Sequence, residues 1–200
     1  MEIYLIRHGE TDYNLQGIVQ GSSVNTDLNA TGVSQAEKFY STYKEVAFDK
    51  IYTSTLNRAI QSVQKFIDKG IDWETTEGLN EINWGNSDGQ KVNVKEHQEY
   101  LNTLKKWQEG QYDVRMPGGE SPLDVLERQK EIKNILNNSE HKKILICMHG
   151  RAMRVFLCNM LNMELSNMEE FIHSNLCLYV LRKSPLGFEI VKSNDTAHLA

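Results

Sequence analysis

The sequence lacks a long apolar run, a cysteine framework and an excess of basic residues. No run approaches the roughly 18–20 apolar residues of a membrane helix, and Met1–Arg7 has neither the basic nor the apolar region of a signal peptide. The three cysteines are odd in number and show no Cys-x-x-Cys spacing. This argues against a structural zinc site or a disulfide framework. These absences predict a cytoplasmic protein that does not bind a membrane.

Proline is scarce as well, with three residues in 200, whereas hydrophobic residues make up 40% of the chain and charged residues 24%. This composition favours a folded domain with a real core over disorder, and the length suits one domain, with or without an inserted cap. The net charge of −5 argues against nonspecific nucleic-acid binding, which needs a basic surface. An acidic protein that binds an anion must concentrate its positive charge locally, so the positions of single arginines are informative.

Strand and helix patterns alternate along the chain. Short apolar runs at 3–6, 50–53 and 144–148 predict buried strands, and late strands are expected at 176–181 and 188–191. Helical patterns follow the first three runs, and Ser121 and Pro122 are typical of a helix start. Val33, Ala36 and Phe39–Tyr40 should share one face of the first helix. We therefore predict an α/β fold, a three-layer sandwich with a mostly parallel central sheet and helices on both faces.

The stretch from 85 to 118 differs from the rest because it is polar and rich in aromatic residues. It has a helical pattern near 94–107 and contains Trp84, Tyr100, Trp107 and Tyr112 in or beside it. We interpret about 85–117 as a small helical cap insertion in a single domain spanning 1–200. Its aromatic residues either line a pocket or pack locally.

Three polar clusters stand where predicted strands end: Arg7-His8-Gly9-Glu10-Thr11, Ser54 through Arg58, and His149-Gly150. Ligands collect at the carboxyl ends of strands in open α/β sheets, so two histidines and two arginines should converge there. Arginine forks offer bidentate donors to phosphoryl oxygens, and a neutral imidazole can attack phosphorus. Phosphoryl transfer otherwise needs mainly positioning and charge stabilisation. The pattern therefore predicts phosphoryl transfer at this edge.

At these residues the sequence resembles the histidine phosphatase superfamily, also called phosphoglycerate-mutase-like. The run from Arg7 to Thr11 resembles its signature, Ser54 through Gln61 its second arginine motif, and His149-Gly150 its second histidine. The likeness continues over nearly the whole chain, at Asn14 and Gln20-Gly21 (phosphate-binding loop), Leu79-x-Glu81 (acid motif), Pro117 to Ser121 (a later loop) and Asn194 to Leu199 (the tail).

The resemblance implies a role for each of these residues. His8 would take the phosphoryl group, and Glu81 would protonate the leaving alkoxide and then help to activate water. The phosphoryl oxygens would be held by Arg7, Arg58 and His149, with further substrate-binding donors from Asn14, Gln20, Gly21 and the Gly150 amide. The resemblance implies no metal and no organic cofactor. The partner would be a small phosphorylated metabolite.

The residues after Glu81 indicate the branch of the family. Mutase members have Glu-Arg-His-Tyr-Gly there, whereas this chain has Glu81-Ile82-Asn83-Trp84-Gly85, and the longer mutase insertion has no counterpart before Pro117. A phosphatase acting on small monoesters is therefore favoured. The alternatives are a cofactor-dependent phosphoglycerate mutase, a non-catalytic member that binds phosphorylated ligands, and a metal-dependent hydrolase that uses His8, His149 and Glu81 as ligands.

The other histidines have little supporting context. His97, His141 and His173 are predicted to be surface residues. The tail motif around His198 predicts docking near the site, and a frayed terminus is the alternative.

Overall fold

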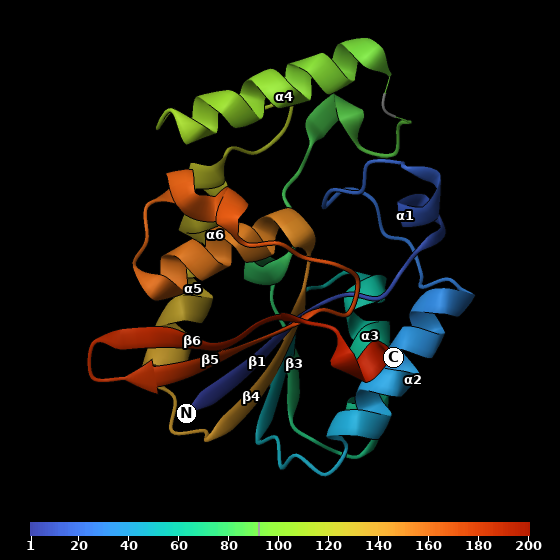
Figure 1. The fold of residues 1–200 in the computed structure, drawn as a ribbon, viewed down its shortest axis with the longest axis vertical. Coiled ribbons are helices and arrows are strands. Elements are labelled where there is room, and N and C mark those ends of the chain that lie inside the picture. Colours follow the sequence, from blue (N-terminus) through green and yellow to red (C-terminus); the bar gives the residue numbers. More distant parts are fainter. Residues whose placement is uncertain (92) are drawn as a thin grey trace.

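A computed structural model describes residues 1–91 and 93–200, and in this part of the chain a mixed sheet runs through the centre (Figure 1). The described strands form one sheet in the order β3-β2-β4-β1-β5-β6. The strands are β1 (Glu2–Arg7), β2 (Lys50–Thr53), β3 (Trp73–Thr75), β4 (Lys143–Met148), β5 (Leu178–Ser184) and β6 (Gly187–Asp195). The pairs β1–β4, β4–β2 and β2–β3 are parallel, whereas β5 is antiparallel to both β1 and β6. The prediction of a mostly parallel sheet is confirmed.

Helices cover both faces of this sheet (Figure 1). One face carries α2 (Ala30–Tyr43) and α3 (Asn57–Asp68), and the other carries α5 (Pro122–Asn138) and α6 (Gly150–Leu161). Beyond the carboxyl end of β1 lie α1 (Asp12–Gln16) and α4 (Val94–Gln108), and α4 crosses the top of the molecule in this view. The 3-10 turns are η1 (Glu77–Leu79), η2 (Gly85–Ser87), η3 (Leu165–Glu170) and η4 (Ala197–Leu199).

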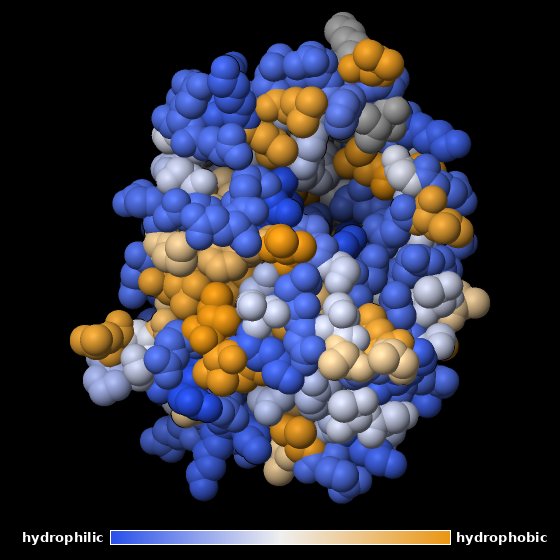
Figure 2. Space-filling model, viewed as in Figure 1, coloured by the Kyte–Doolittle hydropathy of each residue, from blue (hydrophilic) through white to orange (hydrophobic). Residues whose placement is uncertain are grey.

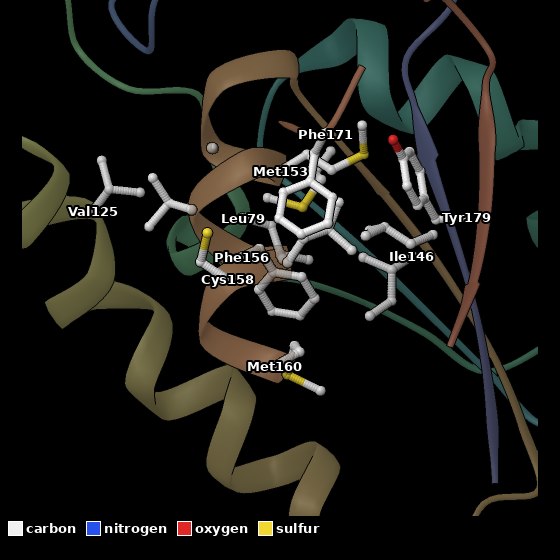
Figure 3. Close-up of a cluster of buried hydrophobic side chains, with 14 of the residues drawn as sticks. Leu79, Val125, Ile146, Met153, Phe156, Cys158, Met160, Phe171 and Tyr179 are labelled. Carbon is white, nitrogen blue, oxygen red and sulfur yellow. The ribbon is translucent and has the colours of Figure 1, made fainter. Parts of the chain in front are cut away.

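The two faces of the sheet bury separate apolar cores, because successive side chains of a strand point to opposite sides. Ile3 and Leu5 of β1 pack with α5 and α6, whereas Ile6 packs with α2 and α3. Figure 3 shows the first core, where Met153 and Phe156 of α6 lie against the sheet. Each fully buried aliphatic or aromatic side chain contributes roughly 1.5–3 kcal/mol. These cores hold the carboxyl ends of β1 and β4 in fixed positions.

Helix α5 begins as the sequence predicts. The Ser121 hydroxyl accepts a hydrogen bond from the Asp124 N–H, the Asp124 carboxylate accepts one in return from the Ser121 N–H, and Pro122 is the first helical residue. A second capping box, between Asn93 and Glu96, begins α4. The helix expected near 94–107 is therefore present, and it carries the residues that cover the carboxyl edge of the sheet.

Three details differ from the sequence predictions. Val33 is 49% exposed, because the buried residues of α2 are Gly32 and Phe39 and Val33 lies outside that stripe. The short edge strand β3 was not predicted. The tail is neither frayed nor part of the pocket described below: His198 is 8% exposed and packs edge-on against Phe39 of α2. Among the residues described, no helix has the length and apolar character needed to cross a bilayer.

Candidate active site

A pocket of about 270 Å³ opens beyond the carboxyl end of β1, beneath α4. Figure 2 shows the hollow on this face of the molecule. Five of the residues predicted from the sequence line it, namely Arg7, His8, Asn14, Gln20 and Glu81. The rest of the described lining consists of Val19, Trp84, Ser87, Glu96, His97, Tyr100 and Met116. Arg58 and His149 lie behind this surface, and Gly21 and Gly150 are not among the lining residues.

His8 follows β1 and is 3% exposed. Its Nδ1 lies 2.7 Å from the Gly9 carbonyl oxygen. Because a carbonyl oxygen only accepts, this bond requires the proton on Nδ1 and leaves a lone pair on Nε2. Burial, with the charges of Arg7 and Arg58, holds the pKa of His8 well below 6.5. The imidazole is therefore neutral at pH 7, and its Nε2 carries a free lone pair.

Positive charge surrounds this imidazole. Arg58 is fully buried, and it donates to the carbonyl oxygens of Val24 (2.6 Å) and Gly21 (3.3 Å). Burial lowers the pKa of Arg58 to about 10 and also lowers the pKa of Arg7. Both guanidinium groups remain charged at neutral pH. An anion placed beside His8 would therefore meet two cations in a site of low dielectric constant, where their attraction is strong.

His149 stands against His8, with 5.1 Å between the ring centroids. Its Nε2 lies 2.7 Å from the Ser54 hydroxyl, and burial, followed by the charge of Arg58, lowers its pKa well below 6.5. Among the described residues, the Nδ1 of His149 and the Nε atoms of Arg7 and Arg58 are buried without a hydrogen-bond partner. Unpaired buried polar atoms cost stability, and an anion would satisfy them. Because these residues stand next to His8, the unpaired atoms are candidate donors for an anion there.

Glu81 is 7% exposed and is held by three backbone N–H groups. Its Oε1 accepts from Ile82 and Ala152 (both 2.8 Å), and its Oε2 accepts from Arg151 (3.0 Å). Arg151 and Ala152 belong to the first turn of α6, whose N–H groups have no partner within the helix and bond to the Glu81 side chain instead. The start of α6 therefore fixes Glu81 in the pocket lining that also contains His8.

Asn14 and Gln20 are joined through Thr11. Asn14 accepts from the Thr11 N–H (3.2 Å) in the capping box of α1, and the Gln20 amide donates to the Thr11 hydroxyl (2.8 Å). Gly21 acts by packing: its N–H donates to Asp88 (2.7 Å), and a Cβ at this position would lie 2.3 Å from the Asp88 carboxylate. Asp88 thereby holds the loop whose carbonyl oxygens receive Arg58.

His173 is not a surface residue, so that prediction was wrong. It is partly buried, its Nδ1 lies 3.3 Å from a terminal nitrogen of Arg7, and burial and Arg7 lower its pKa to about 3. A Cβ at Gly150 would lie 2.6 Å from the His173 ring, so glycine is needed there. His173 reaches the site because the Leu176 N–H bonds to the Arg7 carbonyl oxygen, next to the β1–β5 pair. No local sequence pattern marks this contact.

Arg151 is a further residue that sequence reasoning left without a role. It pairs with Glu169, donates to the Tyr100 hydroxyl (3.0 Å) and lies 5.6 Å from the centre of the Trp107 ring. It therefore connects the start of α6 to the helix that covers the pocket. Of the four aromatic residues in or beside the 85–118 stretch, Trp84 and Tyr100 line the pocket, whereas Trp107 is buried in the core and Tyr112 packs against it.

Residues 1–91 and 93–200 contain no group of three or more His, Cys, Asp or Glu side chains arranged to hold a metal ion. The described donors are instead guanidinium, imidazole and amide groups, which suit an anion.

Together with the three-layer fold, these donors define an enzyme that acts on phosphate esters. The sequence model of the histidine phosphatase superfamily (branch 1) matches residues 3–196, and the chain belongs to this family. The resemblance noted from the motifs is confirmed.

The relatives include phosphatases and mutases. Phosphoserine phosphatase 1 of Hydrogenobacter thermophilus is 26% identical over 100% of this chain and 94% of its own length. A 2,3-bisphosphoglycerate-dependent phosphoglycerate mutase of Bradyrhizobium diazoefficiens is 30% identical over 78% of each chain. The crystal structure of a phosphoserine phosphatase from Entamoeba histolytica, in complex with 3-phosphoglyceric acid, superimposes with a TM-score of 0.81 at 27% identity, over 100% of this chain and 99% of that one.

Proposed function

We propose that this chain is a phosphatase that hydrolyses small phosphate monoesters through a phosphohistidine on His8. The observation that carries the proposal is the hydrogen bond from His8 Nδ1 to the Gly9 carbonyl oxygen, which leaves the Nε2 lone pair of this pocket residue as the nucleophile. The lowered pKa of His8 supports it, because a protonated imidazole has no lone pair to offer.

In the first step, Nε2 attacks phosphorus, the bond from phosphorus to the ester oxygen breaks, and Glu81 gives that oxygen a proton. In the second step, Glu81 takes a proton from water, the water oxygen bonds to phosphorus, and the bond from phosphorus to Nε2 breaks. Arg7, Arg58 and His149 hold the phosphoryl oxygens throughout. The remaining donors are Asn14, Gln20 and the Gly150 amide, whereas Gly21, expected from the sequence to bind substrate, supports the loop through its bond to Asp88.

The proposal also covers the setting of the enzyme. Residues 1–200 form one catalytic domain, in which about 85–117 is an inserted cap that selects the alcohol part of the substrate. Catalysis needs no metal, and the partner is a small phosphorylated metabolite rather than a nucleic acid or a membrane. A cytoplasmic location fits the three cysteines, which are all buried and unpaired.

Phosphoglycerate mutase is the second candidate, favoured by the similarity to the Bradyrhizobium mutase. A mutase must keep its phosphohistidine away from water until the substrate has turned over. Phosphatase is preferred because the mutase residues after Glu81 are replaced by Ile82-Asn83-Trp84.

Rapid quenching with a labelled monoester tests the nucleophile. The wild-type protein should form an acid-labile, base-stable phosphoenzyme and release inorganic phosphate steadily in excess EDTA. His8→Ala should abolish both, whereas His141→Ala, a change beside the amino end of β4 and outside the described pocket lining, should keep the label. Turnover by His8→Ala at the wild-type rate would remove His8 from the mechanism. Efficient interconversion of 3- and 2-phosphoglycerate, with little phosphate release, would instead identify a mutase.

A further inference from the structure

The pocket changes character between its floor and its walls. The floor carries Arg7, His8 and Glu81, whereas the rest of the described lining combines the apolar and aromatic side chains Val19, Trp84, Tyr100 and Met116 with the polar residues Asn14, Gln20, Ser87, Glu96 and His97. We propose, on the basis of the phosphatase function above, that the site selects monoesters whose alcohol carries a flat aromatic or apolar group and no second anion. The wall residues Val19, Trp84, Tyr100 and Met116 then determine specificity.

The aromatic wall is held in place before a substrate arrives. Trp84 stacks on the buried Trp107, with 6.1 Å between the ring centroids and 24° between the planes. Tyr100 meets Trp84 edge-to-face at 5.3 Å, and its hydroxyl accepts a hydrogen bond from Arg151. Because these rings are already fixed, they lose little conformational freedom when a substrate binds. Most of the apolar area that the substrate buries against them therefore contributes to affinity.

A second anion on the substrate has no cationic partner among the wall residues that the structure describes. Of the lining residues that the structure describes, only Arg7 carries a fixed positive charge, and it stands in the floor with the nucleophile. Arg151 and Arg154 of α6 both pair with Glu169. The rim carries the Glu96 carboxylate, which repels anions. A second carboxylate or phosphate would therefore lose its hydration without compensation.

Two matched pairs of esters test this selectivity. 2-Phenylethyl and propyl phosphate release alcohols of similar reactivity, so their kcat/KM values compare binding to the walls. We expect a preference of about tenfold or more for the phenyl compound. Glycerol 3-phosphate and 3-phosphoglycerate differ by one carboxylate, and we expect the carboxylate to lower kcat/KM by about tenfold. Equal values within both pairs, or a preference for 3-phosphoglycerate, would overturn the inference.

Variants of the wall and rim separate binding from folding. Tyr100→Leu should reduce the preference for the phenyl compound, and Tyr100→Phe, which keeps the ring, should retain it. His97→Arg adds a cation at the exposed rim and should raise the ratio of 3-phosphoglycerate to glycerol 3-phosphate turnover by about tenfold. The phosphoenzyme formed with propyl phosphate is measured in parallel. If the labelled phosphohistidine forms on His8 but the two ester pairs show no selectivity, only this inference fails. If no phosphohistidine forms, the proposed function fails.

Discussion

Replacing Glu81 with glutamine tests whether this residue donates a proton or only shapes the site. The side chain keeps its size, and its amide oxygen can still accept from the Ile82 and Ala152 N–H groups. Its new NH₂ group would face the Arg151 N–H, which now donates to Oε2 at 3.0 Å. One buried N–H without an acceptor costs about 1–3 kcal/mol, so the variant should fold with reduced stability.

The catalytic loss should depend on the leaving group. A positioned general acid contributes about 10²–10⁴-fold, or roughly 3–5 kcal/mol of activation free energy. We expect Glu81→Gln to lower kcat/KM by that factor for propyl phosphate. The loss should be less than about tenfold for p-nitrophenyl phosphate, because nitrophenolate leaves without a proton.

The assay is phosphate release from both esters, with urea unfolding to confirm that the variant is folded. Glu77→Gln is the matched control, because Glu77 is an exposed carboxylate on η1 and should leave both rates unchanged. Equal losses on the two esters would refute the reasoning. Glu81 would then position the substrate or the start of α6 without donating a proton.

Two further predictions concern stability and phosphate binding. The free energy of unfolding should fall as the pH drops from 7 to 5, because His173 takes up a proton near pH 6.5 when unfolded, whereas burial and Arg7 keep its pKa at about 3 in the fold. Allowing for its partial exposure, His173 contributes about 1 kcal/mol to this fall in urea titrations, and His173→Gln should reduce the fall. Asp88→Asn should loosen the loop that receives Arg58 and raise the inhibition constant of inorganic phosphate by about tenfold, whereas Asp113→Asn, an exposed change in the same segment, should not. Stability independent of pH, or unchanged phosphate inhibition in Asp88→Asn, would contradict these two arguments.

Elements with a strong local signal could be predicted from the sequence. The apolar runs at 3–6 and 50–53 lie in β1 and β2, and the serine and proline before α5 begin that helix as expected. The edge strand β3 was missed because it has three residues, of which only Trp73 is partly buried, and therefore shows no apolar pattern. Its pairing with β2 determines its conformation.

The same distinction between local signal and tertiary contact holds for the site residues. His8 and Glu81 belong to recognisable motifs, and both line the pocket. The contacts of His173 and Arg151 depend on tertiary structure: the first lies beside Arg7 next to the β1–β5 pair, and the second reaches across to Tyr100 of α4. A single sequence carries no periodicity that records either contact.

The position of β1 has a consequence for how the protein is made. This strand lies between β4 and β5, so its partners are synthesised long after it, with β5 beginning at Leu178. At roughly 5–20 residues per second, the ribosome needs roughly 10 to 35 s to travel from β1 to β5. Until β4 is made, Ile3, Leu5 and Ile6 have no neighbouring strand to pair with and are available to chaperones. His8 is thus made early, but its surroundings are complete only when the last strands have joined the sheet.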